Sequence, residues 1–204
     1  LLDGSHQNFL SHVKAGKSGN SRSTHTDSGE PSPQLDKDFL GLQQFARGEI
    51  SLFGSCGKKH PTIALDAYRK ALQIGLPDKT YTAEAHHRMG LAFKSLGKLN
   101  EAKSTLEQAL SFEPYSATML NSYGTVLTEL HQLPQAITAY EQALALKPDY
   151  ANARFNLAEA CEGVNPKRAI QEYETYLILA EDQPQEASKV QVAKEKLQSL
   201  QRGH

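Results

Sequence analysis

Apolar residues recur every three or four positions from about residue 37 to residue 200, and the segment before residue 37 lacks this pattern. A recurrence of three to four puts apolar side chains on one face of an α-helix. Ala, Leu, Glu, Lys and Gln, which are good helix formers, dominate this part of the chain. Gly and Pro interrupt it at intervals that predict turns. The pattern therefore predicts an all-α fold of short antiparallel helices over 37–204.

Residues 1–36 have a different composition. Ser and Gly are frequent there and large apolar residues are few, so the segment cannot bury enough apolar surface to offset the entropy lost on ordering. We expect a disordered or loosely attached tail that ends at the Glu-Pro-Ser-Pro run of residues 30–33. The alternative is a partner-binding motif, since Phe9, Leu10 and Val13 could form one apolar helix face.

The helical part repeats with a constant period. The interval from Gly90 to Gly124 equals the interval from Gly124 to Ala158, and Pro114 and Pro148 share that spacing. Each of the three small residues follows a large apolar one, so a second helix can approach the first closely. The spacing delimits three repeats, at 83–116, 117–150 and 151–183.

A degenerate repeat precedes these three, and a further helix follows them. Ala64, Tyr68 and Ala71 have the spacing found in the second helix of the later repeats, which predicts a repeat over about 37–79. Its first helix is expected within 37–54, with an apolar face formed by Phe39, Leu42, Phe45 and Ala46. Residues 184–202 carry one apolar stripe, which is typical of a capping helix with its other face in water.

This pattern resembles the tetratricopeptide repeat family. In 83–116 the matching residues are Met89, Gly90, Phe93, Ala102, Leu106, Ala109 and Pro114; 117–150 matches as well, and 151–183 less closely. The resemblance implies a right-handed helical-repeat solenoid of about four antiparallel helix pairs plus a C-terminal capping helix. It also implies a concave groove, lined by the first helix of each pair, that binds an extended peptide or a helix of a partner protein.

The resemblance assigns the groove to the second, fifth, sixth, ninth and twelfth residues of each repeat. These residues are Glu84, His87, Arg88, Leu91 and Lys94, then Thr118, Asn121, Ser122, Thr125 and Thr128, then Asn152, Phe155, Asn156, Glu159 and Glu162. We expect a basic end at Arg88 and Lys94 and an acidic end at Glu159 and Glu162. The alternative is that these side chains are only the solvated face of amphipathic helices.

One family subtype binds the acidic tails of heat-shock chaperones through a carboxylate clamp of Lys, Asn and Arg. The clamp positions here hold His87, Leu91, Ser122, Asn152 and Asn156. The two cations that the third repeat of such a clamp supplies are missing in this register and in the one a repeat earlier, and carboxylate recognition depends on them. The sequence therefore argues against a heat-shock chaperone tail as partner.

Charge and composition exclude other classes of function. The chain has 22 Lys and Arg against 23 Asp and Glu, which argues against a nucleic-acid binder with a broad basic surface. No apolar run approaches the roughly 20 residues of a membrane span. Cys56 and Cys161 are too few for a disulfide framework and slightly favour a reducing, cytoplasmic compartment, which the sequence otherwise leaves open.

No motif of an enzyme or a metal site is evident. The segment 54–59 lacks the spacing of a phosphate-binding loop, and the chain has no His-Glu-x-x-His and no Cys-x-x-Cys. Cys56, His60, His86 and His87 would hold a metal only if a loop and a helix brought them together. We therefore expect no catalytic residues, no metal and no cofactor, and we expect Cys161 in the core.

The sequence favours a non-enzymatic adaptor that binds a peptide or helix of another protein in its groove. One alternative is a structural subunit or self-associating scaffold that uses the convex face or the capping helix. Another is the interaction domain of a larger enzyme.

Overall fold

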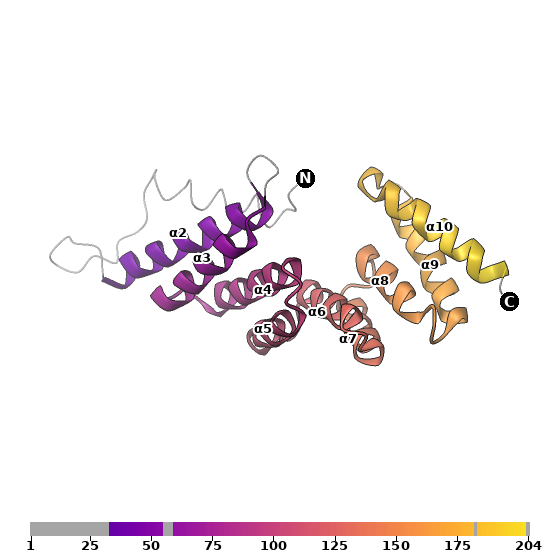
Figure 1. The fold of residues 1–204 in the computed structure, drawn as a ribbon, viewed down its shortest axis with the longest axis horizontal. Coiled ribbons are helices and arrows are strands. Elements are labelled where there is room, and N and C mark those ends of the chain that lie inside the picture. The colour runs from indigo at the N-terminus through magenta and orange to yellow at the C-terminus, as the bar shows by residue number, and fades with distance from the viewer. Residues whose placement is uncertain (1–32, 55–58, 182, 203–204) are drawn as a thin grey trace. The chain divides into compact units, whose positions relative to one another are not determined.

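The computed structural model describes residues 33–54, 59–181 and 183–202. The helices are α2 (Pro33–Phe53), α3 (Pro61–Ile74), α4 (Lys79–Ser95), α5 (Leu99–Phe112), α6 (Ala117–Glu129), α7 (Leu133–Leu146), α8 (Ala151–Cys161), α9 (Pro166–Ala180) and α10 (Ala187–Arg202), with a short 3₁₀ turn at Pro184–Glu186 (Figure 1). No strand occurs in these ranges. The predicted all-α helical-repeat fold is confirmed.

The chain divides into two units, Leu1–Asp36 and Lys37–His204, and the repeats lie in the second. Most of the segment expected to be a tail, with Phe9, Leu10 and Val13, lies outside the described residues. Helix α2 begins at Pro33, inside that segment.

Each helix of the second unit packs against its neighbours in the chain. The pairs α4–α5, α6–α7 and α8–α9 are in extensive contact, α5 meets α6 and α7 meets α8, and α10 packs on α9. Short polar caps set the starts of several helices: the Asp78, Ser116 and Asn165 side chains accept hydrogen bonds from the backbone N–H groups of Tyr81, Met119 and Arg168. The result is a layered core in which each layer depends on the next.

A glycine in the first helix of a pair meets a large side chain of the second helix. A Cβ added to Gly124 would lie 2.5 Å from Cε1 of Tyr140, and one added to Gly48 would lie 2.5 Å from Cε1 of Tyr68. Because only glycine permits this approach, Gly48 sets the contact between α2 and α3 as Gly124 sets the contact between α6 and α7.

The prediction of which residues form the apolar face of α2 is partly wrong. Phe45 is 3% exposed and packs edge-on against Tyr68, with 5.5 Å between ring centroids. Phe39, expected on the same face, is 61% exposed. Phe39 precedes Gly48 by nine positions. At about 100° per residue, nine positions place the two residues on opposite sides of a helix, so Phe39 faces away from the contact with Tyr68.

Candidate functional site

The first helices of the pairs form one row. Helix α6 contacts both α4 and α8, whereas the second helices α5, α7 and α9 make no comparable contact with one another in the described ranges. The positions predicted to line a groove therefore lie on adjacent helices. We call these side chains of α4, α6 and α8 the first-helix face.

Hydrogen bonds link successive first helices across this face. Nε2 of His87 lies 2.9 Å from Oγ of Ser122, and Nδ2 of Asn156 donates to Oδ1 of Asn121 over 2.9 Å. Both bonds join the fifth residue of one repeat to the sixth residue of the next. The sequence placed these residues on one surface, and the structure shows that they also tie the helices together.

The Asn121–Asn156 pair uses only part of its hydrogen-bonding capacity. Nδ2 of Asn121 and Oδ1 of Asn156 have no hydrogen-bond partner among the described residues. Neither atom is buried. Both residues are half-buried. The pair therefore presents one amide donor and one carbonyl acceptor side by side.

Hydroxyl groups next to this pair are held in fixed positions. Oγ1 of Thr125 donates to the backbone carbonyl of Ser122 over 2.7 Å, and Oγ1 of Thr128 donates to that of Gly124 over 3.0 Å. Thr118 is exposed at the start of α6, and Leu91 on α4 is half-buried. Nζ of Lys94 donates to Oγ1 of Thr125 over 3.5 Å and lies 3.1 Å from Glu129, so the charge of Lys94 in the middle of the face is paired.

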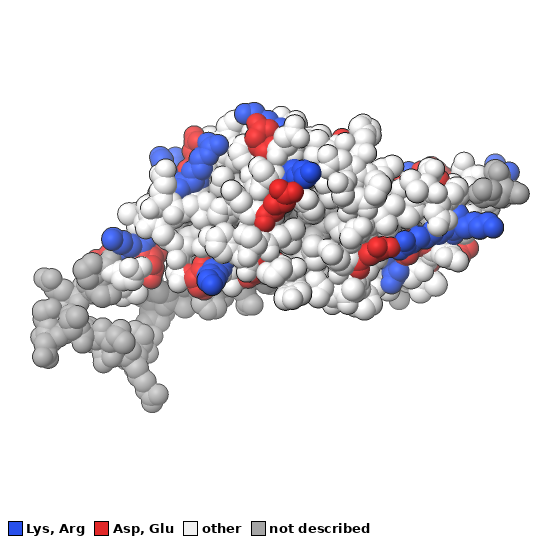
Figure 2. Space-filling view, turned by 90° about the horizontal axis from the view of Figure 1, so that it is seen from below, with Lys and Arg blue, Asp and Glu red and all other residues white. Residues whose placement is uncertain are grey.

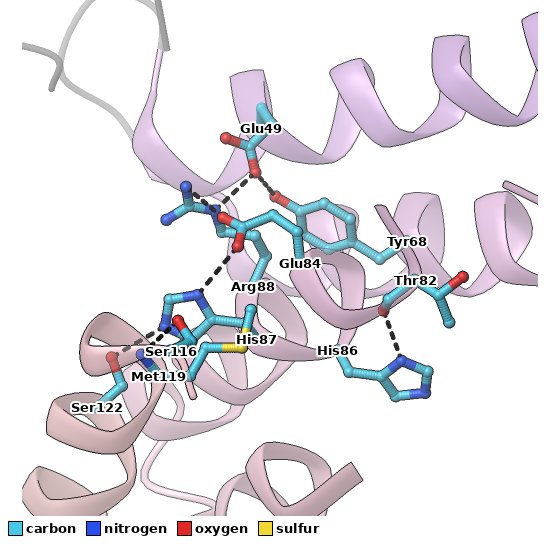
Figure 3. Close-up of polar contacts among 10 residues, drawn as sticks. All are labelled: Glu49, Tyr68, Thr82, Glu84, His86, His87, Arg88, Ser116, Met119 and Ser122. Atoms are coloured by element: carbon cyan, nitrogen blue, oxygen red, sulfur yellow. Dashed lines mark hydrogen bonds and ion pairs between the residues drawn. The ribbon is translucent and has the colours of Figure 1, made fainter. Parts of the chain in front are cut away.

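Arg88 is part of an ion-pair network (Figure 3). Its guanidinium lies 3.2 Å from the carboxylate of Glu49 and 2.6 Å from that of Glu84, and 5.0 Å from the ring centroid of Phe53. The Arg88 side chain is only 16% exposed. It joins α4 to α2, so it does not give this end of the face the basic character that the sequence suggested.

Glu49 and His87 extend that network on either side. The hydroxyl of Tyr68 donates to Glu49, and burial together with that carboxylate raises the pKa of Tyr68 well above its usual range. His87 is 2% exposed, and its Nδ1 lies 3.5 Å from Glu84. The network runs from α2 and α3 through α4 to Ser122 of α6, as Figure 3 shows.

Helix α10 contacts most of the groove positions assigned to α8. Nζ of Lys196 lies 3.1 Å from Glu159 and 2.7 Å from Glu162, and Lys189 donates to Asn152. Phe155, also assigned to the groove, is 6% exposed and belongs to the core with Tyr173 and Tyr176. Neither lysine was among the residues predicted for the site. Lys189 and Lys196 lie two helical turns apart beside the apolar stripe of α10, and this spacing could have placed both of them against α8.

The described residues contain no group of three or more His, Cys, Asp and Glu that could hold a metal ion. His86 lies with Nδ1 2.8 Å from the carbonyl oxygen of Thr82 and stacks on Phe112, away from the contacts of His87. Cys161 is 1% exposed, and burial raises the pKa of its thiol, which disfavours a nucleophilic thiolate. Cys56 lies outside the described residues.

None of the helices in the described ranges is long and apolar enough to cross a membrane. Figure 2 shows one side of the molecule, on which acidic and basic side chains alternate over most of the surface and basic side chains form a row toward the right-hand end.

Three solved structures share the fold. MamA is 22% identical, with a TM-score of 0.62, and the match covers 74% of this chain and 84% of MamA. YrrB, described as a TPR protein with an unusual peptide-binding site, is 18% identical, with a TM-score of 0.59, and the match covers 77% of this chain and 78% of YrrB. The Yersinia enterocolitica type III secretion chaperone SycD, in complex with a peptide of the translocator YopD, is 15% identical, with a TM-score of 0.58, and the match covers 60% of this chain and 94% of SycD. No protein with a curated description matches the sequence significantly.

Two segments match family models: residues 83–116 match one described as tetratricopeptide repeat, and residues 124–163 match one described as TPR repeat. The first segment spans α4 and α5, and the second runs from the middle of α6 to the end of α8. These matches show that 83–116 and 124–163 carry tetratricopeptide repeats, in agreement with the resemblance in the sequence, and the solved structures share the helical-repeat fold.

Proposed function

We propose that this protein is a non-enzymatic adaptor that binds an extended peptide segment of a partner protein on its first-helix face. The observation that carries the proposal is the Asn121–Asn156 pair, in which each amide uses one atom for the other and keeps one for a ligand. An extended peptide offers alternating N–H and C=O groups, and these match one amide donor beside one acceptor.

The fixed geometry of the face also favours binding. Ser122, Thr125, Asn121 and Asn156 are already held by hydrogen bonds to neighbouring helices or to the backbone. A ligand therefore has few side chains to order, and the entropy cost of association falls. The peptide complex of SycD, which shares the fold, supports the same use of this architecture.

An acidic heat-shock chaperone tail is not the expected ligand. In a carboxylate clamp the third repeat supplies two cations. In this chain those two positions hold Asn152 and Asn156, which carry no charge. Asn152 instead accepts a hydrogen bond from Lys189, and Asn156 binds Asn121.

The proposal is tested by selecting peptides from a phage-displayed random heptapeptide library on the intact protein. The Kd of the best peptide is then measured on the protein and on two variants. Asn156→Ala removes half of the amide pair and should weaken binding about three- to tenfold, the value of one hydrogen bond. Asn100→Ala changes the same residue type at an exposed position on α5 and should leave the Kd unchanged.

Backbone amide shifts on titration locate the peptide. Shifts centred on Asn121, Thr125 and Asn156 support the proposal. Failure to select any peptide, or shifts confined to the second helices or to α10 with no effect of Asn156→Ala, would reject it and favour the structural or self-associating alternative.

A further inference from the structure

Helix α2 carries a second row of apolar side chains, away from its contact with α3. We call this row the α2 stripe, and it consists of Phe39, Leu42, Ala46 and Ile50. At about 100° per residue, the four side chains lie within about 80° of one another around the helix. Phe39 and Ile50 are 61% and 60% exposed, and Leu42 and Ala46 are half-buried. Apolar side chains that are aligned on one exposed face, rather than scattered singly, are typical of an interaction surface.

The position of Ile50 is covered by the preceding helix pair in the later repeats. Ile50 follows Gly48 by two positions, and the residues two positions after the small residue of the later repeats are Ala92, Val126 and Ala160. These three are at most 2% exposed, and Ala160 packs with residues of α7, the preceding second helix. In the described ranges no helix precedes α2, and Ile50 lacks that cover there.

The position of Ala46 differs from its counterparts in chemistry. The counterparts lie two positions before the small residue, and each bonds to the preceding first helix: Arg88 to Glu49, Ser122 to His87, and Asn156 to Asn121. In α2, this position and that of Leu42, four residues earlier, are apolar. The α2 stripe therefore makes none of the polar contacts that join the later first helices, and it favours an apolar surface opposite it.

The α2 stripe is nearly symmetric along the helix. Phe39 and Ile50 lie at similar distances on either side of Gln44, and so do Leu42 and Ala46. If two copies of α2 pack antiparallel about this point, Phe39 meets Ile50 of the second copy, and Leu42 meets Ala46 of the second copy. A two-fold interface requires such a self-complementary surface, because the same residues face one another from both copies. The symmetry of the stripe therefore favours a second copy of this chain over an unrelated partner.

The area of the α2 stripe is compatible with a weak dimer. Its four side chains expose roughly 300 Å² in each copy, and roughly 600 Å² in two. Apolar atoms make up about 57% of a non-obligate interface, so the whole contact would bury roughly 1,000 Å², which is the lower limit for a specific interface. We therefore expect a dimer that dissociates in the micromolar range.

We propose that a second copy of this chain docks on the α2 stripe, giving a dimer in which the two α2 helices pack antiparallel about a two-fold axis. Each α2 then covers the face of the other that a preceding helix pair covers in the later repeats. The dimer uses none of the residues assigned to the peptide on α6 and α8, so this inference stands independently of the proposed function.

Sedimentation velocity of the full chain between about 1 and 200 µM tests the proposal, because a micromolar dimer dissociates over this range. Ile50→Lys places a charge in the contact and should raise the Kd of the dimer at least about tenfold. Ile178→Lys changes the same residue type at a 72% exposed position on α9 and should leave the Kd unchanged. Because the contact is apolar, added salt should not weaken it. A chain that stays monomeric, or equal weakening by both variants, would overturn the proposal.

Disulfide cross-linking tests the antiparallel arrangement. In a Cys56→Ser background, in which Cys161 is 1% exposed, a mixture of Phe39→Cys and Ile50→Cys chains should form covalent dimers on oxidation. Phe39→Cys alone should not, because the two copies of residue 39 lie roughly 16 Å apart along the helices and a disulfide needs Cα atoms within about 7 Å. Efficient cross-linking of Phe39→Cys alone would refute the antiparallel pairing, and circular dichroism checks that each variant is folded.

Other occupants of the α2 stripe give different results. Dimerisation that occurs only after residues 1–32 are removed would overturn the proposal and assign the stripe to that segment. A monomer with and without residues 1–32 would overturn it equally and assign the stripe to another protein.

Discussion

Gly124→Ala tests the close packing of the first and second helices. The added methyl carbon would lie 2.5, 2.8 and 2.9 Å from three ring carbons of Tyr140, whereas favourable carbon contacts lie at about 3.5–4.0 Å. The ring must therefore move by about 1 Å. Tyr140 is 1% exposed and its hydroxyl is bound to Thr128, so the ring has no free space into which to move.

The expected loss of stability follows from three contributions. Overpacking of a core costs about 1–3 kcal/mol, and disturbing the Tyr140–Thr128 hydrogen bond costs about 1 kcal/mol. Alanine is a better helix former than glycine by about 1 kcal/mol. The net loss in unfolding free energy should be about 1–3 kcal/mol, measured by urea unfolding followed with far-UV circular dichroism.

A double-mutant cycle identifies the cause. In a Tyr140→Ala background the ring is absent, so Gly124→Ala should be neutral or stabilising by up to about 1 kcal/mol. Gly163→Ala is the control, because no atom lies within 4 Å of an added Cβ there, and its effect should stay within about 0.5 kcal/mol. The same loss in both backgrounds would show that the clash with Tyr140 is not responsible.

Arg88→Ala should lower the unfolding free energy by about 2–4 kcal/mol, because it removes the cation beside Glu49, which is 5% exposed; adding Glu49→Gln should recover part of the loss, and no recovery would contradict the ion pair. The pKa of Tyr140, about 12, exceeds its ordinary value of 10.0, so its contribution to stability is complete below pH 10 and is lost as pH rises through 12. A difference titration against Tyr140→Phe, followed by phenolate absorbance, measures that pKa, and ionisation near pH 10 would contradict it. In a Cys56→Ser variant, Cys161 should react with a thiol reagent at least roughly 100-fold more slowly than in the unfolded chain, and equally fast labelling would place it at the surface.

The later repeats were predictable because their signals keep a constant spacing. The interval from Gly90 to Ala102 is the same as the interval from Gly124 to Ala136. In the first repeat, by contrast, the interval from Gly48 to Ala64 is a full helical turn longer. The longer connection shifts the phase of the first helix, which is why the sequence pattern misplaces Phe39 and does not reveal the role of Gly48.

The candidate site was predictable as a set of positions, but its bonding was not. Helical spacing alone places Arg88 and Asn156 on the exposed side of their helices. The partner of Arg88 is Glu49, which belongs to the preceding repeat, and that of Asn156 is Asn121, which also lies one repeat earlier. Such pairings depend on how one helix pair lies against the next, so a residue pattern within one repeat does not contain them.

The layered packing has a mechanical consequence. When each layer touches only its neighbours, a pulling force applied to the ends passes through every interface in series, and the one with the smallest buried surface yields first. Helix α10 has a single fully buried side chain in its described length, Ala193; Val190, Leu197 and Leu200 pack partly buried against the core, and Lys196 pairs with Glu159 and Glu162. Because the Lys196 ion pairs are partly exposed to solvent, raising the salt concentration should lower the force at which α10 detaches from the last repeat.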